Sequence, residues 1–263
     1  MILVVPVSHT DREVVRGFLK AFTVFNSYEK HDLLVVCRPS DEVFAHQVYT
    51  EILESCSFKG TFLHVFEHDG IRGWPRGCNH YWAETVKFLH SNNNTKPWLW
   101  LEMDMTPLRY DWADALEQEY NTCGKPFLGN IANTTTVTSK RKVIVIGKHL
   151  VGAAIYPPNL NKYSEIWSHV PDTAIAWDVL CQNDFFPHSH KTKLIQHCYR
   201  TMNYKKHFNQ VTGEVSVYGE PTIKDDDLQY HDAPVIDFEN AVIVHGCEDD
   251  TLANIVVNEV QKI

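Results

Sequence analysis

The chain has few of the features that mark secreted, membrane or nucleic-acid-coating proteins. Its 263 residues include seven cysteines, an odd number without a C-x-x-C pair, which is typical of free thiols in a reducing compartment. No apolar run approaches the roughly 20 residues that a membrane helix needs, and the apolar start lacks the basic segment of a signal peptide. The formal net charge of −9 argues against binding of nucleic acid through bulk electrostatics. We therefore expect a soluble, cytoplasmic protein with no membrane partner.

Several familiar enzyme motifs are also missing. The sequence has no Walker lysine motif, no G-x-G-x-x-G and no G-x-S-x-G, which argues against a P-loop enzyme, a dinucleotide oxidoreductase and an α/β-hydrolase. Hydrophobic residues make up 44% and charged residues 22%, an ordinary balance for a soluble globular protein. No internal repeat and no long linker are visible, so we expect a single domain over residues 1–263.

Apolar segments and amphipathic segments alternate through the first part of the chain. The short apolar, β-branched segments predict strands, and the segments with apolar residues at helical spacing predict helices. The predicted strands are Ile2–Val7, Leu33–Cys37, Phe62–Phe66 and Trp98–Met105, and the predicted helices are Asp11–Phe25, Asp41–Cys56 and Asn79–His90. Strands separated by helices imply crossover connections and a parallel sheet. We therefore predict an α/β fold whose residues 1–108 form a Rossmann-type half, with helices on both faces of a mostly parallel sheet.

The pattern is looser after residue 108. It predicts helices over Asp111–Tyr120, Thr173–Asn183 and Thr251–Val260, and strands at Phe127–Gly129, Leu150–Tyr156 and Ala241–His245. Lys142–Ile146 alternates between polar and apolar residues, and we expect it to pair as a hairpin with Val151–Tyr156. Residues 109–263 are therefore expected to form a mixed second half.

The stretch Pro97–Leu108 carries the strongest functional signal. Seven of its first nine residues are apolar, as in a strand buried on both faces. Glu102 and Asp104 are two apart near its end, so in a strand they point the same way, at the edge where open α/β sheets bind ligands. Because two buried, unpaired carboxylates are costly, they favour a shared divalent cation such as Mg²⁺ or Mn²⁺, itself bridged to phosphates. The alternative is that both carboxylates reach water or nearby lysine and arginine side chains.

The run Arg72–Asn79 is a second candidate. Its two glycines allow close approach of the backbone, its two arginines can pair with phosphate, and the start of the predicted helix favours an anion. The alternative is a surface turn with incidental arginines. Beside the acidic pair, the run predicts a phosphate-binding turn.

This layout resembles the GT-A class of nucleotide-sugar glycosyltransferases. In that class a D-x-D motif at the end of a strand holds a divalent cation against the sugar diphosphate, and here the motif would be Glu102-Met103-Asp104, an E-x-D departure. The resemblance implies one catalytic domain with a nucleotide-binding half over residues 1–108 and an acceptor-binding half over residues 109–263. It implies Mn²⁺ or Mg²⁺ as cofactor, with Asp104 as a ligand. Glu102 is implied as a direct ligand, as a ligand through water, or as a contact to the ribose.

The resemblance also implies roles for residues elsewhere. Family members often supply a late histidine as a metal ligand, here His245, and inverting members use a carboxylate as the general base, here Asp178. A histidine in the core, or an aspartate that pairs with a helix dipole, is the structural alternative for each. The nucleotide-sugar contacts implied by position are Pro6, Ser8, Arg38, Asp69, Arg76, Asn79 and Glu102. Trp74, Trp177 and Tyr156 are candidates for stacking on the acceptor.

Together these features predict a metal-dependent transferase that moves a sugar from a nucleoside-diphosphate sugar to a soluble hydroxyl acceptor. The acceptor is a saccharide, a small molecule, a protein, or a hydroxymethylated base of phage-type DNA, whose phosphates the basic loop Lys140–Lys142 can contact. One alternative is a nucleotidyltransferase, although Ser8–Arg12 is a poor version of the glycine-rich loop such enzymes carry. Another is a sugar- or nucleotide-binding protein without catalysis, against which the presence of Asp104 and Asp178 argues.

Overall fold

The computed structural model describes residues 1–138, 143–165, 170, 173, 175–197, 227–230, 239–247 and 250–260. The loop Lys140–Lys142, expected to contact phosphate, lies outside the described residues.

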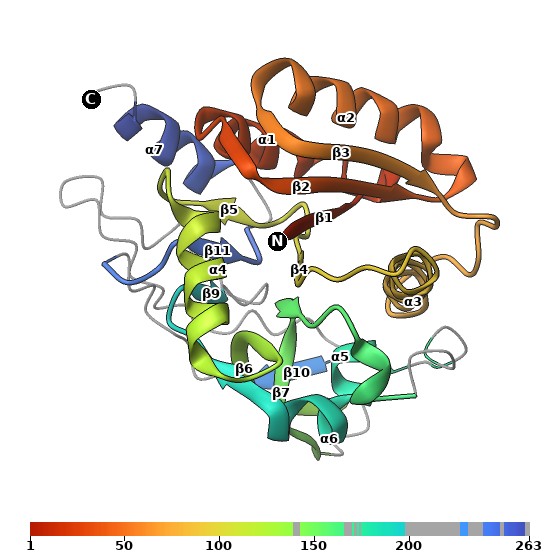
Figure 1. Cartoon of the computed structure of the whole chain (residues 1–263). Coiled ribbons are helices and arrows are strands. Elements are labelled where there is room, and N and C mark those ends of the chain that lie inside the picture. The colour runs from red at the N-terminus through yellow and green to blue at the C-terminus, as the bar shows by residue number, and fades with distance from the viewer. Residues whose placement is uncertain are drawn as a thin grey trace.

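Four parallel strands form the centre of the molecule (Figure 1). They are β1 (Ile2–Pro6), β2 (Ser27–Cys37), β3 (Ser57–Val65) and β4 (Trp98–Trp100), in the order β4-β1-β2-β3. The connecting helices are α1 (Val15–Val24), α2 (Glu42–Ser55) and α3 (Arg76–Ser91). Short 3-10 helices at His9–Asp11 and Pro39–Asp41 follow β1 and β2. All carboxyl ends of these strands therefore lie at one edge of the sheet.

Alternate residues of the strands face two separate hydrophobic cores. Leu3, Val5 and Leu99 pack with α1, α2 and other helices of one face, whereas Val4 and Trp98 pack with α3 on the other. This division follows from the two-residue period of a strand and explains why β1, β4 and the second half of β2 are apolar at consecutive positions. The predicted α/β fold, with helices on both faces of the sheet, is confirmed (Figure 1).

The second half of the chain extends the same sheet with antiparallel strands. After α4 (Trp112–Cys123), β6 (Phe127–Thr138) and β7 (Val143–Tyr156) form a long hairpin, and β7 pairs with β4. The sheet order is β10-β6-β7-β4-β1-β2-β3, with β8 (Ser189–Lys191) also on β6 and β10 at Asp227–Tyr230. The expected pairing of Lys142–Ile146 with Val151–Tyr156 is wrong, because residues 143–146 and Val151–Tyr156 belong to the single strand β7, whose partner is β6. Lys142 itself lies outside the described residues.

The predicted helix Thr173–Asn183 is replaced by two short ones. They are α5 (Trp177–Leu180) and α6 (Gln182–Phe185), and 3-10 helices occupy Leu160–Lys162 and Phe186–His188. The chain enters α5 through Ala176 in an extended conformation, with φ −60° and ψ 139°. The side chain of Asn79 accounts for this, since its amide binds the carbonyl oxygens of Val170 and Ile175.

A small second sheet lies beside the first. It consists of β5 (Thr106–Pro107), β11 (Ile243–His245) and β9 (Ile195–His197), in that order. The predicted strand Trp98–Met105 is therefore too long: β4 ends at Trp100, and the chain turns before it joins the second sheet as β5. The closing helix α7 (Thr251–Val260) lies against α1, where Lys20 binds Asp250 at 3.2 Å. None of the described helices is long and apolar enough to cross a membrane.

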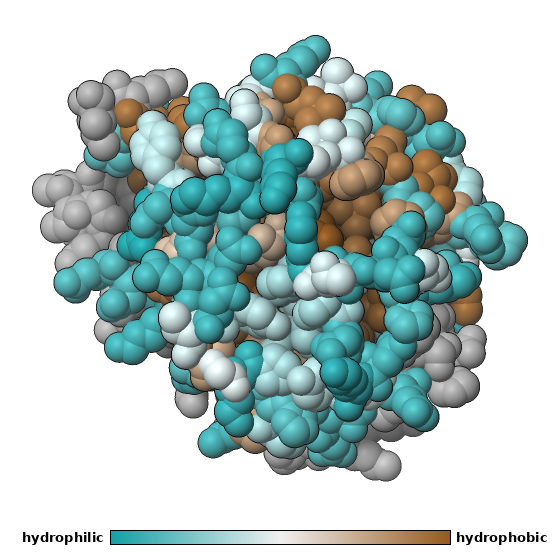
Figure 2. Space-filling view, in the orientation of Figure 1, coloured by the Kyte–Doolittle hydropathy of each residue, from teal (hydrophilic) through white to brown (hydrophobic). Residues whose placement is uncertain are grey.

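The surface in the view of Figure 2 is mostly hydrophilic, with hydrophobic residues gathered where Figure 1 shows α2 and β3. Exposed apolar side chains on these elements include Val43 and Phe62. β3 is the edge strand of the sheet.

Candidate metal and donor site

Glu102, Asp104 and His245 form a cluster at the carboxyl edge of the parallel strands. Nε2 of His245 lies 3.1 Å from Oε2 of Glu102 and 3.3 Å from Oδ1 of Asp104. Ligand atoms of all three residues lie within 4.8 Å of one another. Asp104 and His245 are buried, whereas the side chain of Glu102 is 30% exposed. The structure therefore brings together the three residues expected to hold a cation.

The small sheet, rather than a continuous strand, brings these residues together. Glu102 and Asp104 lie in a turn in which the backbone N–H of Met105 donates to the carbonyl of Glu102 at 3.0 Å. β5 begins two residues after Asp104 and pairs antiparallel with β11, Thr106 opposite Val244, so His245 comes beside the turn. The sequence argument that both carboxylates share one face of a strand is thus wrong, although the two side chains do converge.

The chain after His245 folds back onto the acidic turn. The backbone N–H of Cys247 donates to the carbonyl of Asp104 at 2.7 Å. Between them Gly246 has a φ of 89°, in the left-handed region that favours glycine. The segment Asp104–Thr106 is therefore held to the chain on both sides of His245, by the pairing of Thr106 with Val244 and by the hydrogen bond between Asp104 and Cys247.

The carboxylates control the charge of the histidine. Burial lowers the pKa of His245, but Asp104 and Glu102 outweigh this and raise its pKa to about 10. The imidazolium then neutralises part of the acidic pair. Two carboxylates and an imidazole are also donors that Mn²⁺ accepts, and the carboxylates suit Mg²⁺. The donor set therefore fits a divalent cation.

Two neighbouring side chains contact the atoms of Glu102 and His245 that point away from the centre of this cluster. The indole N–H of Trp100 donates to Oε1 of Glu102 at 3.1 Å, and Nδ1 of His197 lies 2.7 Å from Nδ1 of His245. Sequence reasoning missed His197. Its only signal is that it ends a short strand as His245 does, and this is informative only once β9 and β11 are known to pair.

Asp178 lies close to the same cluster, across β7. Its Oδ1 accepts from the N–H of Val179 at 2.9 Å, and its Oδ2 lies 4.0 Å from Nε2 of His149. Burial raises the pKa of Asp178, His149 opposes this, and Glu102 adds to the increase. Gly152 of β7 is the shared neighbour: its backbone bonds to Asp178, and a Cβ there would lie 3.4 Å from Oε1 of Glu102.

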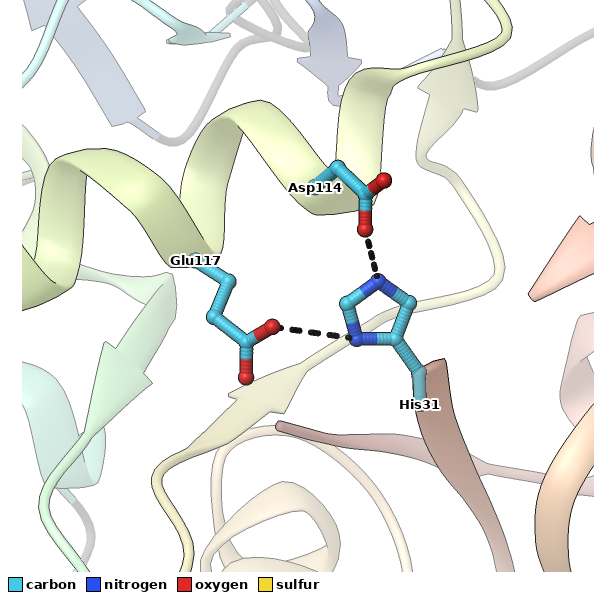
Figure 3. A group of neighbouring side chains, drawn as sticks. All are labelled: His31, Asp114 and Glu117. Carbon is cyan, nitrogen blue, oxygen red and sulfur yellow. Dashed lines mark hydrogen bonds and ion pairs between the residues drawn. The ribbon is translucent and has the colours of Figure 1, made fainter. Parts of the chain in front are cut away.

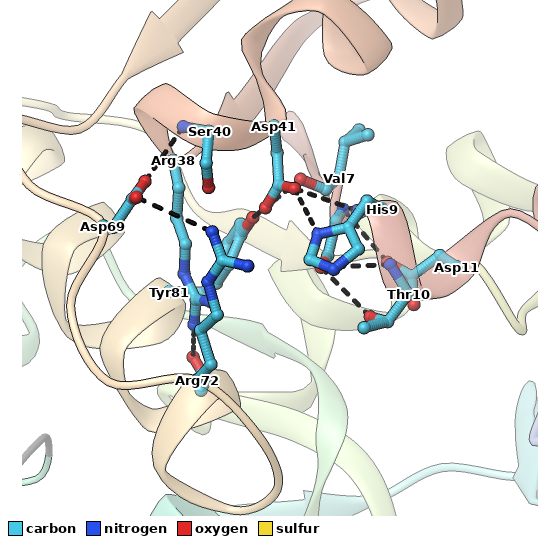
Figure 4. A network of polar contacts seen from close by, with 12 residues as sticks. Val7, His9, Thr10, Asp11, Arg38, Ser40, Asp41, Asp69, Arg72 and Tyr81 are labelled. Carbon is cyan, nitrogen blue, oxygen red and sulfur yellow. Dashed lines mark hydrogen bonds and ion pairs between the residues drawn. The ribbon is translucent and has the colours of Figure 1, made fainter.

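Arg38 and Asp69 belong to a polar network at the ends of β1, β2 and β3 (Figure 4). The guanidinium of Arg38 is buried, lies 4.8 Å from the ring centre of Tyr81 and donates to the carbonyl of Ile71 at 3.0 Å. Asp69 accepts from the N–H of Ser40 at 2.9 Å. Arg38 therefore holds the turn that leads into α3.

The loop after β1 joins the same network. Ser8 caps the 3-10 helix at His9–Asp11. The buried carboxylate of Asp41 lies 2.6 Å from Nδ1 of His9 and 2.8 Å from the hydroxyl of Tyr81 (Figure 4). Hydrogen bonds to the carboxylate lower the pKa of Asp41 against the effect of burial. The loops that follow β1 and β2 are thus fixed relative to each other.

Three further predicted contact residues are buried, as Arg38 is. The amide of Asn79 has no exposed surface and binds the backbone around α5, accepting from the N–H of Trp177 at 2.9 Å. Trp177 is 4% exposed and stacks on Trp82 with ring centres 4.5 Å apart. Tyr156 is also fully buried. Asn79, Trp177 and Tyr156 therefore have almost no exposed side-chain surface in this structure, and the ligand contacts expected of them stay predictions.

The remaining candidates stay at the edge where the strands end. Pro6 is the last residue of β1, and Arg76 is the exposed first residue of α3. Trp74 lies in the preceding turn and is 75% exposed. The ligand contacts expected of Pro6, Arg76 and Trp74 are compatible with these positions and stay predictions.

A second group of metal-ligand type lies at the opposite edge (Figure 3). Nε2 of His31 is 3.0 Å from Oδ1 of Asp114, and Nδ1 is 3.8 Å from Oε2 of Glu117. The Met1 ammonium contacts Glu117, and the Lys30 ammonium contacts Asp114. Burial and the Met1 ammonium lower the pKa of His31. Because two cations of the chain already bind these carboxylates, we interpret the group as an ion-pair cluster between β2 and α4.

Comparison with known proteins gives structural similarities only. No protein-family model and no curated protein matches the chain. Mouse xyloside xylosyltransferase 1 in its apo form aligns at a TM-score of 0.46 and 9% identity, over 93% of this chain and 96% of that one. Galactosyltransferase LgtC in complex with donor and acceptor sugar analogs aligns at 0.49 and 11%, over 100% and 96%. A 4-diphosphocytidyl-2C-methyl-D-erythritol synthase aligns at 0.43 and 12%, over 69% and 82%. At TM-scores below 0.5 these similarities do not bear on the activity of this chain.

Proposed function

We propose that the chain is a metal-dependent, cytoplasmic glycosyltransferase that moves a sugar from a nucleoside-diphosphate sugar to a soluble hydroxyl acceptor. The observation that carries this proposal is the convergence of Glu102, Asp104 and His245 at the carboxyl edge of the parallel strands. Ligands of open α/β sheets bind at that edge. Asp178 lies next to the same cluster across Gly152, which gives a candidate base beside the candidate cation site.

Asp104 and His245, with Glu102, would hold Mn²⁺ or Mg²⁺. When bound, the ion neutralises the charge that develops on the departing nucleoside diphosphate. Arg76 at the first turn of α3 adds a positive charge, and the N-terminus of this 16-residue helix favours the same phosphates. Pro6, Ser8 and Asp69 flank the base and ribose in this proposal, and Arg38 orients the turn before α3.

Asp178 is the proposed general base of an inverting reaction. Its carboxylate takes the proton of the acceptor hydroxyl while that oxygen bonds to the anomeric carbon. The bond from the anomeric carbon to the diphosphate oxygen breaks at the same time, and its electron pair leaves with the diphosphate. Because burial raises the pKa of Asp178, the carboxylate is a stronger base than an exposed aspartate. A retaining reaction would not need this base.

The acceptor is proposed to be a saccharide, a small molecule, a protein or a hydroxymethylated DNA base. Trp74 is the exposed aromatic residue from the predicted stacking set that remains open to such a ring.

Thermal unfolding with nucleotides tests the donor site. UDP, GDP, CDP and TDP are added with and without Mn²⁺ to the wild type, to Asp104→Asn and to His46→Gln, an exposed histidine on α2 as control. A ligand at 100 times its Kd adds about 2.7 kcal/mol to the free energy of unfolding, which is on the order of 5–10 °C in Tm. We expect a shift that needs one nucleotide and Mn²⁺, is lost in Asp104→Asn and is kept in His46→Gln.

The other outcomes separate the alternatives. The corresponding nucleoside triphosphates are added in a parallel series, and a shift with these but not with the diphosphates would favour a nucleotidyltransferase. Binding of the nucleotide sugar without turnover or hydrolysis would favour a binding protein. No shift with any nucleotide would contradict the proposal.

A further inference from the structure

We propose that His197 is a positioning residue that holds His245 in the orientation and tautomer needed to bind the cation. This inference rests on the proposed metal site and names a residue that the sequence did not point to. Its basis is the arrangement of the two rings. Nε2 of His245 faces Glu102 and Asp104 at 3.1 and 3.3 Å, and Nδ1 of the same ring faces Nδ1 of His197 at 2.7 Å.

The two nitrogens of His245 have different tasks. An imidazole binds a cation through a nitrogen without a proton, and Nε2 is the nitrogen on the side of the carboxylates. The proton of the neutral ring is then on Nδ1 and needs an acceptor. Nδ1 of His197 is that acceptor when His197 carries its own proton on Nε2. A metal-binding histidine is commonly held through its other ring nitrogen in this way.

The fold fixes His197 in this place. β9 and β11 pair in parallel with His197 opposite His245, and the ring centres are 4.4 Å apart. Ile195 and Ile243, which begin the two strands, are buried and opposite each other, and the N–H groups of Val242 and Ile243 both donate to the carbonyl of Leu194. β9 therefore cannot slide along β11 without exposing Ile195 and losing these hydrogen bonds.

Trp100 plays the corresponding part for the carboxylate. It donates to Oε1 of Glu102, so Oε2 is the oxygen that faces His245. Trp100 thus binds Oε1 of Glu102, and His197 contacts Nδ1 of His245. The other two atoms, Oε2 of Glu102 and Nε2 of His245, face each other.

Mn²⁺ affinity of His197 variants, measured by titration calorimetry without nucleotide, tests the role. His197→Asn keeps an oxygen near the place of Nδ1 and serves as the rescue variant. His197→Gln and His197→Leu place no acceptor there, and His46→Gln is the control for a histidine remote from the site. We expect Mn²⁺ affinity to fall by about 10–100-fold in the Gln and Leu variants and to stay close to wild type in the Asn and His46 variants. Circular dichroism without metal checks that each variant is folded.

Two results would overturn the inference, and they are distinguishable. If wild type binds Mn²⁺ and all three His197 variants bind it equally well, His197 has no positioning role and the proposed metal site stands. If wild type binds no Mn²⁺, the metal site fails together with this inference. The Gln variant replaces one polar side chain by another, so the comparison with Asn remains available if the Leu variant does not fold.

Discussion

Two groups in this molecule have the same donors, one histidine and two carboxylates, at opposite edges of one sheet. At the amino edge, Asp114 and Glu117 face the ammonium groups of Lys30 and Met1 as well as His31. At the carboxyl edge, Glu102 and Asp104 both face His245. The two groups differ in the cations that the chain supplies: two ammonium groups besides the histidine at the amino edge, and the imidazolium of His245 at the carboxyl edge.

The two histidines respond to these surroundings in opposite directions. The carboxylates raise the pKa of His245 to about 10 against the effect of burial, whereas burial and the Met1 ammonium lower the pKa of His31. His245 therefore carries a proton on Nε2 that a bound metal ion would displace. The lowered pKa of His31 favours the neutral form of that ring within its ion-pair cluster.

Substitution of one carboxylate in each group should give the largest difference in Mn²⁺ affinity between the two groups. Asp104→Asn should lose Mn²⁺ affinity by more than the roughly 10–100-fold typical of residues that only contact a ligand, because it removes a ligand oxygen. Glu117→Gln should keep the affinity and lower the free energy of unfolding by about 1–3 kcal/mol. Calorimetry with Mn²⁺ and urea unfolding without metal measure the two effects. Loss of Mn²⁺ binding in Glu117→Gln would move the metal site to the amino edge.

The pH dependence of stability should have opposite signs for the two histidines. In metal-free protein, the protonated His245 stabilises the fold fully below the unfolded pKa of about 6.5. This contribution is lost as the pH rises from there through about 10, the folded pKa. A pKa unit corresponds to about 1.4 kcal/mol, so the alkaline loss amounts to several kcal/mol. The pKa of His31 is lowered, so its effect is a loss of stability as the pH falls below about 6.5.

Urea unfolding in EDTA between pH 5 and pH 10 (roughly the span of both effects) measures these slopes. His245→Gln should flatten the alkaline side, and His31→Gln should flatten the acid side. Equal alkaline slopes in wild type and His245→Gln would show that the carboxylates do not hold the proton on His245.

Two glycines give the smallest and most specific comparison. Gly246, with φ 89°, follows His245, and Gly124, with φ 67°, ends α4 near the amino edge. Alanine at either position should cost about 1–2 kcal/mol of folding free energy because both are left-handed. Only Gly246→Ala should weaken Mn²⁺ binding as well, since it shifts the segment His245–Cys247, which is hydrogen-bonded to Asp104. Equal Mn²⁺ affinities in the two variants would mean that the segment His245–Cys247 does not position the metal ligands.

The fold of the first half could be predicted because its signals are local. Four apolar strand segments separated by amphipathic helices are readable at two- and 3.6-residue periods, and the four strands lie next to one another in the sheet. The errors came where a distant group overrides local preference. The amide of Asn79 binds the carbonyl oxygens of Val170 and Ile175, which a helix before Trp177 would have used for its own hydrogen bonds. After Trp100 the chain leaves the main sheet because β5 pairs with β11.

The candidate site divides in the same way. The carboxylates of Glu102 and Asp104 were visible as charges at the end of an apolar run, and His245 as the end of a short strand. Nothing local distinguished Trp177, a buried stacking partner of Trp82, from an exposed binding residue. Aromatic side chains serve both purposes, so only the packing separates them.

The sequence by itself determined the α/β class, the parallel core and the acidic pair, because hydrophobic period and charge are properties of neighbouring residues. The tertiary structure decided that these acids meet His245, that the ring of His197 contacts that of His245, and that the chain's own cations pair with the carboxylates near His31. Such meetings depend on pairing register and on side chains that are far apart in the chain, here 143 positions between Glu102 and His245. A one-residue slip of β11 would reverse the side of the sheet that His245 faces.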